Sequence, residues 1–161
     1  MGYKVAMGFH SAVDYELNWD AGVITTLASQ YDIHEKELSM DLAIKTERDL
    51  IVVTLAHLKA GIGGEFIPES NDICVRFAEH FQYRLTLGGT AQRAAIAISK
   101  LGYESLLSMC CFNEHMRRLL PPQVHYFSNV GYDSQEVYPH VILSYPANET
   151  IRVNDISFTT P

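Results

Sequence analysis

The feature that most constrains this chain is a pair of adjacent glycines, Gly88 and Gly89, between a β-type segment at 85–87 and a helix-forming run that Gly102 closes. A glycine pair lets the backbone come close to a ligand, because no Cβ is in the way. The first N–H groups of the following helix have no partner within it and carry partial positive charge. This corner can therefore hold a hydroxyl or an anionic oxygen. The simpler alternative is a strand–turn–helix connection in which the glycines only form the turn.

The run after the glycine pair contains small residues that would let a helix lie close against a sheet. They are Ala91, Ala94, Ala95 and Ala97. Gly102 then fits the C′ position at which helices often end. Residues 105–112 follow as an apolar segment with the spacing of a strand. The order strand, helix, strand predicts a βαβ unit in a parallel sheet, so the predicted fold class is α/β.

The N-terminal segment supplies a candidate acid for a site. Residues 3–9 predict a short buried strand in which Val5, Met7 and Phe9 alternate, and Asp14 follows it. In open α/β sheets ligands bind beyond the carboxyl ends of the strands, which is where this order would put Asp14. The alternative is that Asp14 caps the helix expected next in the chain.

The remaining segments predict helices first and strands last. Apolar spacing predicts helices over residues 21–30 and 71–83. Residues 113–120 are expected to form a short helix that two prolines at 121–122 stop, and residues 31–48 a loop and then a helix. Residues 49–58 are apolar and fit either a strand or a helix. Residues 137–145 and 150–158 predict two strands of a β-hairpin around a turn-rich connector at 146–149.

A glycine-rich segment at 59–68 contains one acid, Glu65. The phosphate-binding loop of nucleotide-binding proteins needs Gly-Lys-Ser/Thr at its end, and that sequence is absent here. A mobile hinge or a connection to a lid is the better interpretation. From the residues alone, Glu65 is an exposed loop acid.

Composition limits the classes of partner. The chain has 12 Lys and Arg against 19 Asp and Glu, a formal net charge of −7, so a broad nucleic-acid surface is not expected. No apolar run approaches the roughly 20 residues that span a bilayer, so no membrane partner is expected. The three cysteines, Cys74, Cys110 and Cys111, have no metal-site spacing. The adjacent Cys110 and Cys111 are interpreted as buried thiols, and a reducing cytoplasm is the expected location.

The sequence Gly88-Gly89-Thr90-Ala91, with its helix ending in Leu101-Gly102, resembles the Gly-Gly helix of the ribokinase-like sugar kinases. In detail it is most similar to the ADP-dependent glucokinase and phosphofructokinase branch. The resemblance implies that this corner binds a sugar and that residues 49–58 are helical. The chain departs from the family at Ala12, where many members have Asn, and at Gln92-Arg93, where other ribokinase-like kinases have an early Asn.

The resemblance also implies which residues bind the sugar. Val13-Asp14 matches an acid that hydrogen-bonds to sugar hydroxyls, Glu65 matches an acid after a glycine-rich loop, and His140 matches a histidine on a lid strand. A lone histidine on a strand is more often a partly buried structural residue. The implied sugar-binding set is Asp14, Glu65, Gly88, Gly89, Thr90 and His140.

The resemblance implies a ribokinase-like fold, with a mostly parallel sheet flanked by helices and a small β lid around residues 137–158. Residues 1–161 would be the N-terminal part of the kinase domain, roughly its first third to half by domain size. The Gly-x-Gly-Asp anion hole with its catalytic Asp and the Mg-associated acids are expected beyond Pro161. No catalytic residue and no metal ligand are therefore assigned within the chain.

The function implied is the sugar-binding portion of a cytoplasmic, glycolytic carbohydrate kinase. With Mg and ADP as co-substrate, the full protein would phosphorylate a sugar or sugar phosphate such as glucose or fructose 6-phosphate, and this piece alone would be inactive. Two alternatives stay open: a non-catalytic carbohydrate-binding or regulatory module derived from such a kinase, and an unrelated α/β domain with structural glycines. An incomplete sheet would also expose an apolar edge and face, which favours homo-oligomers.

Overall fold

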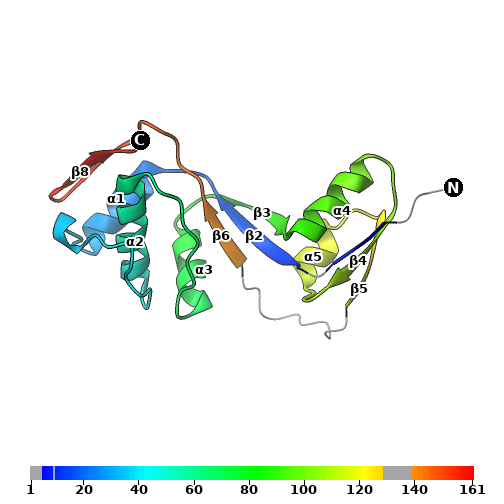
Figure 1. Ribbon diagram of the computed structural model, residues 1–161. Coiled ribbons are helices and arrows are strands. Elements are labelled where there is room, and N and C mark those ends of the chain that lie inside the picture. The colour runs from blue at the N-terminus through cyan, green and yellow to red at the C-terminus, as the bar shows by residue number, and fades with distance from the viewer. Residues whose placement is uncertain (1–4, 9, 129–138) are drawn as a thin grey trace. The chain divides into compact units, whose positions relative to one another are not determined.

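The computed structural model describes residues 5–8, 10–128 and 139–161, and the chain forms two compact units (Figure 1). The first unit comprises Met1–Glu16 and Arg84–His140, and the second comprises Leu17–Tyr83 and Val141–Pro161. The chain passes between the units within β2 (Ala12–Leu17), β3 (Tyr83–Gly88) and β6 (Pro139–Leu143). These strands pair in the order β3-β2-β6.

The first unit contains a parallel sheet in the order β1-β4-β5, made of β1 (Val5–Met7), β4 (Ser105–Met109) and β5 (Val124–Ser128). Helices α4 (Thr90–Lys100) and α5 (Glu114–Leu119) belong to the same unit and share its hydrophobic core. This confirms the α/β class. The predicted βαβ unit is wrong in its membership, because β3 and β4 belong to different sheets; α5 instead connects the parallel strands β4 and β5.

The core of the first unit explains why small residues follow the glycine pair. Ala95 of α4, Leu107 of β4 and Met116 of α5 are all fully buried in one hydrophobic cluster. An alanine at the contact lets the helix approach the sheet closely, as expected. The predicted burial of β1 is wrong for Val5, which is 37% exposed on an edge strand, and Phe9 lies outside the described residues.

The second unit is built on helices whose ends are set by local hydrogen bonds. Asp20 accepts the N–H groups of Gly22 and Val23 at the start of α1 (Ala21–Gln30), which confirms the helix predicted there. Thr46 caps α2 (Glu47–Ala60), and Gly61 ends it at φ 66°. Next comes α3 (Asn71–Glu79). The helix expected within 31–48 is wrong: that segment holds only a 3₁₀ turn, η1 (Glu35–Glu37), ahead of α2.

The predicted hairpin is placed wrongly. β6 pairs with β2, and the hairpin is formed by β7 (Thr150–Val153) and β8 (Ile156–Thr159). The segment expected to be one strand turns at Asn154, whose φ is 52°, a value that asparagine tolerates better than most residues. The Asn154 amide fixes this turn by donating to the Ile33 carbonyl at 2.8 Å.

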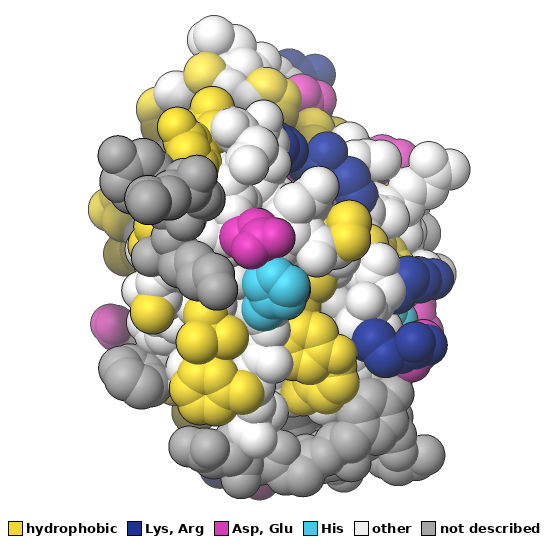
Figure 2. Space-filling view, turned by 90° about the vertical axis from the view of Figure 1, so that its right-hand side faces the viewer, with side chains coloured by type: hydrophobic (Ala, Val, Ile, Leu, Met, Phe, Trp, Pro, Cys, Tyr) yellow, Lys and Arg dark blue, Asp and Glu magenta, His cyan; other side chains and the backbone are white. Residues whose placement is uncertain are grey.

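Some large apolar side chains remain on the surface. In the first unit Leu101, Tyr103, Leu106 and Phe127 are each more than two-fifths exposed. Figure 2 shows one face on which hydrophobic side chains form separate patches between charged ones. Self-association through such surfaces stays a prediction. Across the described ranges, no helix combines the length and apolar character needed to cross a membrane.

Candidate functional site

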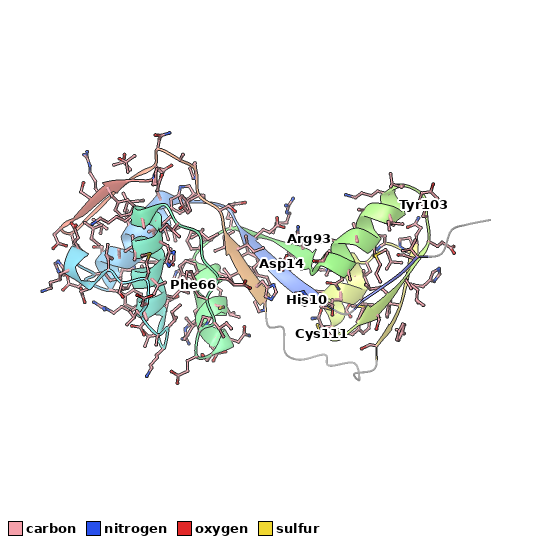
Figure 3. The ribbon with its side chains drawn as sticks, viewed as in Figure 1. His10, Asp14, Phe66, Arg93, Tyr103 and Cys111 are labelled. Atoms are coloured by element: carbon pink, nitrogen blue, oxygen red, sulfur yellow. The ribbon has the colours of Figure 1, made fainter. Side chains whose placement is uncertain are left out.

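The site is organised around Asp14, which lies in the middle of β2 and is 3% exposed. The helix-capping alternative is wrong, because Asp20 caps α1. A buried carboxylate needs a compensating partner. Arg93 of α4 supplies it by donating to Asp14 Oδ2 at 2.7 Å (Figure 3). The hydrogen bond to Asp14 raises the pKa of the Arg93 guanidinium, which keeps its charge.

The second oxygen of Asp14 has spare acceptor capacity. Oδ1 is buried and has no hydrogen-bond partner among the described residues. The imidazole Nδ1 of His140 is 3.5 Å from it, which is long for a hydrogen bond but within ion-pair range if the imidazole is protonated. The ring of His10 lies 5.8 Å from that of His140. Buried polar atoms of proteins almost always have a hydrogen-bond partner. An unpaired buried acceptor beside two exposed imidazoles therefore points to a ligand-binding position.

The glycine pair is packed directly against this acid. A Cβ added at Gly88 would lie 2.1 Å from Asp14 Oδ1. Gly89 has φ +85°, and a Cβ there would lie 2.6 Å from the His10 carbonyl oxygen. Both positions therefore require glycine. The implied sugar-binding set requires Asp14 to lie close to the glycine pair, and the structure shows that it does. Thr90 follows as the exposed first residue of α4.

Helix α4 also positions the strand that carries Asp14. The Gln92 side chain is fully buried, and its Oε1 accepts the Ala12 N–H at 3.0 Å. Gln92 and Arg93 thus fix β2 at Ala12 and Asp14, two residues apart and on the same face of the strand. The sequence had drawn attention to these helix residues only as departures from a family pattern. The contact between Arg93 and Asp14 joins residues 79 positions apart, and no local sequence pattern indicates it.

A more exposed pair continues the polar row on β2. Glu16 accepts from Arg84 and, at 2.8 Å, from the hydroxyl of Thr86, both on β3. The hydrogen bond from Arg84 lowers the pKa of the Glu16 carboxyl. Arg93 also reaches Glu16, at 3.5 Å. Alternate residues of β2 thus present carboxylates to the same cationic side chain.

Glu65 is the predicted sugar ligand that belongs to the second unit. It lies in the exposed segment between α2 and α3. That segment is anchored to α2 by His57, whose Nδ1 is 2.9 Å from the Ile62 carbonyl oxygen and whose ring lies 4.7 Å from that of Phe66. The participation of Glu65 in a sugar pocket stays a prediction.

The described residues contain no group of three or more His, Cys, Asp or Glu side chains arranged to hold a metal ion. What the first unit offers is a carboxylate with one free acceptor, glycine backbone at close range, a helix N-terminus and two imidazoles. These groups can receive and donate hydrogen bonds to a small polyhydroxylated molecule.

Comparisons with known proteins agree with this arrangement. The family model described as "ADP-specific Phosphofructokinase/Glucokinase conserved region" matches residues 3–161. No curated protein matches the chain significantly.

Solved structures share the fold. A phosphofructokinase from Pyrococcus horikoshii OT3, crystallised with AMP, is similar with a TM-score of 0.74 and 15% identity, over 98% of this chain and 39% of that one. A hypothetical ADP-dependent phosphofructokinase from the same organism is similar with a TM-score of 0.74 and 14% identity, over 98% of this chain and 39% of that one. The last common ancestor of ADP-dependent phosphofructokinases from Methanosarcinales is similar with a TM-score of 0.71 and 12% identity, over 99% of this chain and 37% of that one.

The chain thus spans about two-fifths of the length of these structures. The family model covers nearly all of the chain, and the fold agrees with it. The chain belongs to the ADP-specific phosphofructokinase/glucokinase family.

Proposed function

We propose that this chain is the sugar-binding part of an ADP-dependent kinase that phosphorylates a sugar or sugar phosphate such as glucose or fructose 6-phosphate. The observation that carries the proposal is the unpartnered, buried Asp14 Oδ1 lying against the glycine pair. Family membership supports a sugar kinase. A cytoplasmic, glycolytic role is part of the same proposal.

Each group of the site has a role in this proposal. Asp14 Oδ1 accepts a hydrogen bond from a sugar hydroxyl, while Arg93 holds the other oxygen and fixes the carboxylate plane. Gly88 and Gly89 let the sugar approach the backbone, and the first N–H groups of α4 donate to its oxygens. Thr90 and the half-exposed His140 complete the set of groups in the first unit, and Glu65 of the second unit stays a proposed sugar ligand.

Phosphoryl transfer is mainly a matter of positioning and charge stabilisation. The reacting sugar hydroxyl must be held in line with the terminal phosphoryl group of ADP. The residues of this chain contribute that orientation. When bound, Mg²⁺ would neutralise charge on the nucleotide phosphates, and we assign no ligand for it here. Segment 137–158 is proposed to act as a lid that excludes water during transfer.

Calorimetric titration of the chain with glucose and with fructose 6-phosphate tests the proposal. We expect one of them to bind, and inorganic phosphate alone to bind far more weakly. Asp14→Asn should weaken sugar binding roughly ten- to a hundredfold, the range for a hydrogen bond to a charged group. Glu104→Gln is the matched control, because Glu104 is an exposed acid of the same unit. Unchanged affinity in Asp14→Asn would contradict the site assignment.

The alternative of a non-catalytic carbohydrate-binding or regulatory module shares this sugar site and differs in turnover. We expect the chain alone, given ADP, Mg²⁺ and fructose 6-phosphate, to release no phosphorylated product. Product formation would show that the chain carries catalytic groups that we have not assigned.

A further inference from the structure

Two adjacent thiols lie where β4 ends, and one serine contacts both. The Ser11 hydroxyl oxygen is 3.3 Å from Cys110 Sγ and 3.3 Å from Cys111 Sγ. It also accepts the Cys111 N–H at 3.2 Å, and Cys111 Sγ donates to the Ser11 carbonyl at 3.2 Å. Figure 3 shows Cys111 near His10, the residue that precedes Ser11. The buried serine thus contacts both sulfurs.

The two thiols differ in environment. Cys110 is exposed, which corrects the expectation that both were buried, while Cys111 is partly covered and has Met116 Sδ at 4.0 Å. The hydrogen bond from Ser11 lowers the pKa of the Cys110 thiol, whereas burial raises the pKa of Cys111. An exposed thiol with a lowered pKa beside a more buried thiol is the arrangement of an attacking and a resolving cysteine.

Cys74 of the second unit provides an internal comparison. It lies on α3 and is partly exposed. Burial alone raises the pKa of its thiol. The chain thus carries one ordinary cysteine against which the reactivity of the pair can be measured.

We infer that Cys110 and Cys111 form a peroxide-reactive dithiol, in which Cys110 is attacked first and Cys111 resolves the product. The Cys110 thiolate attacks one oxygen of hydrogen peroxide, the O–O bond breaks, and the hydroxide released is protonated by solvent. The Cys111 sulfur then attacks the Cys110 sulfenic acid, an S–S bond forms, and water leaves with the Cys111 proton. In total the dithiol loses two electrons and two protons, and peroxide is reduced to two waters.

The product would be reversible. Cα atoms of adjacent residues are about 3.8 Å apart across a trans peptide, less than the usual separation in disulfides. A disulfide between neighbours is therefore strained and easily reduced by thiols. This favours a switch over a permanent crosslink.

The pair has a physical link to the glycine corner. Oxidation removes the S–H donor that Cys111 gives to the Ser11 carbonyl. Ser11 follows His10, whose carbonyl oxygen is the atom closest to the missing Cβ of Gly89. If the proposed function holds, oxidised protein should bind sugar more weakly, and this second expectation rests on that proposal.

Peroxide titration followed by peptide mass mapping tests the dithiol without any sugar. We expect the peptide with Cys110 and Cys111 to lose two hydrogen atoms while Cys74 stays reduced, and a thiol reductant to restore it. Ser11→Ala should slow the reaction roughly two- to tenfold, the effect of one ordinary hydrogen bond. In Cys111→Ser, Cys110 should persist as a sulfenic acid that a cyclic 1,3-diketone traps.

Equal oxidation of Cys74 and Cys110, disulfide-linked dimers, or an unreactive pair in the wild-type chain would each overturn the inference. Because these readouts need no ligand, they are independent of the sugar-binding proposal. A chain that oxidises as described but binds no sugar in either state would refute the proposed function and leave the dithiol intact.

Discussion

Among the described residues two carboxylate side chains are buried, one in each unit, and their hydrogen bonding differs. Glu47 in the second unit is 8% exposed, and both its oxygens have partners: the Tyr31 hydroxyl at 2.5 Å and His80 Nε2 at 3.1 Å. Asp14 in the first unit is more buried, yet only Oδ2 is hydrogen-bonded. A fully satisfied buried acid ties helices together. An acid with one open oxygen is held ready for a ligand, at a cost in stability.

The largest effect should come from the glycine that packs on the open oxygen. Gly88→Ala puts a Cβ 2.1 Å from Asp14 Oδ1, so either the strand or the acid must move. We expect a loss in the free energy of unfolding of about 1–3 kcal/mol, the usual cost of overpacking, together with loss of sugar binding. Gly63→Ala is the control, since nothing lies within 4 Å of its added Cβ. Urea denaturation checks both, and similar losses would mean that the tight packing at Gly88 does not matter.

The next effect concerns the cation that holds Asp14. Arg93→Leu leaves a buried carboxylate without its donor, which should lower the free energy of unfolding by about 1–3 kcal/mol. Arg84→Leu is the comparison, because Arg84 is 74% exposed and pairs with the more accessible Glu16. Its loss should be at most about 1 kcal/mol. If the two variants unfold at the same urea concentration, Arg93 is not specifically required by the buried acid.

The smallest effects should appear as opposite pH dependences. In the folded protein the pKa of Glu16 is lowered below its ordinary 4.5. Glu16 therefore contributes to the free energy of unfolding above pH 4.5, and this contribution is lost as the pH falls through the folded pKa. The hydrogen bond to Glu47 raises the pKa of Tyr31 above its ordinary 10.0. Tyr31 therefore contributes to the free energy of unfolding below pH 10.0, and this contribution is lost as the pH rises through the folded pKa.

Unfolding free energies across pH check this difference between the units. Glu16→Gln should reduce the loss of unfolding free energy at acid pH, and Tyr31→Phe should reduce the loss of unfolding free energy at alkaline pH. A wild-type acid slope that survives in Glu16→Gln would assign it to other carboxylates.

What the sequence predicts well here is local. The glycine pair, the alanines of α4 and the boundaries of α1 follow from backbone freedom, helix packing and apolar spacing. Arg93 was missed because its partner lies 79 residues away in the sequence, where no local pattern reports the contact. The hairpin was misplaced because Asn154 turns the chain inside a segment that reads as one strand.

The candidate site also has features that the sequence predicts and features that it does not. The nearness of Asp14 to Gly88 is implied by the family resemblance. The position of Asp14 after a strand is wrong, because Asp14 lies in the middle of β2. The open state of Oδ1 and the fixing of β2 by Gln92 depend on side-chain packing across the sheet, which composition and periodicity do not report.

The most direct test of the account is to neutralise the two buried acids one at a time and measure sugar affinity and unfolding free energy on the same samples. We expect Asp14→Asn to weaken sugar binding roughly ten- to a hundredfold with little loss of stability, and Glu47→Gln to lose stability but keep the sugar affinity of the folded protein. Equal effects of the two substitutions on sugar affinity, or full affinity in Asp14→Asn, would contradict it.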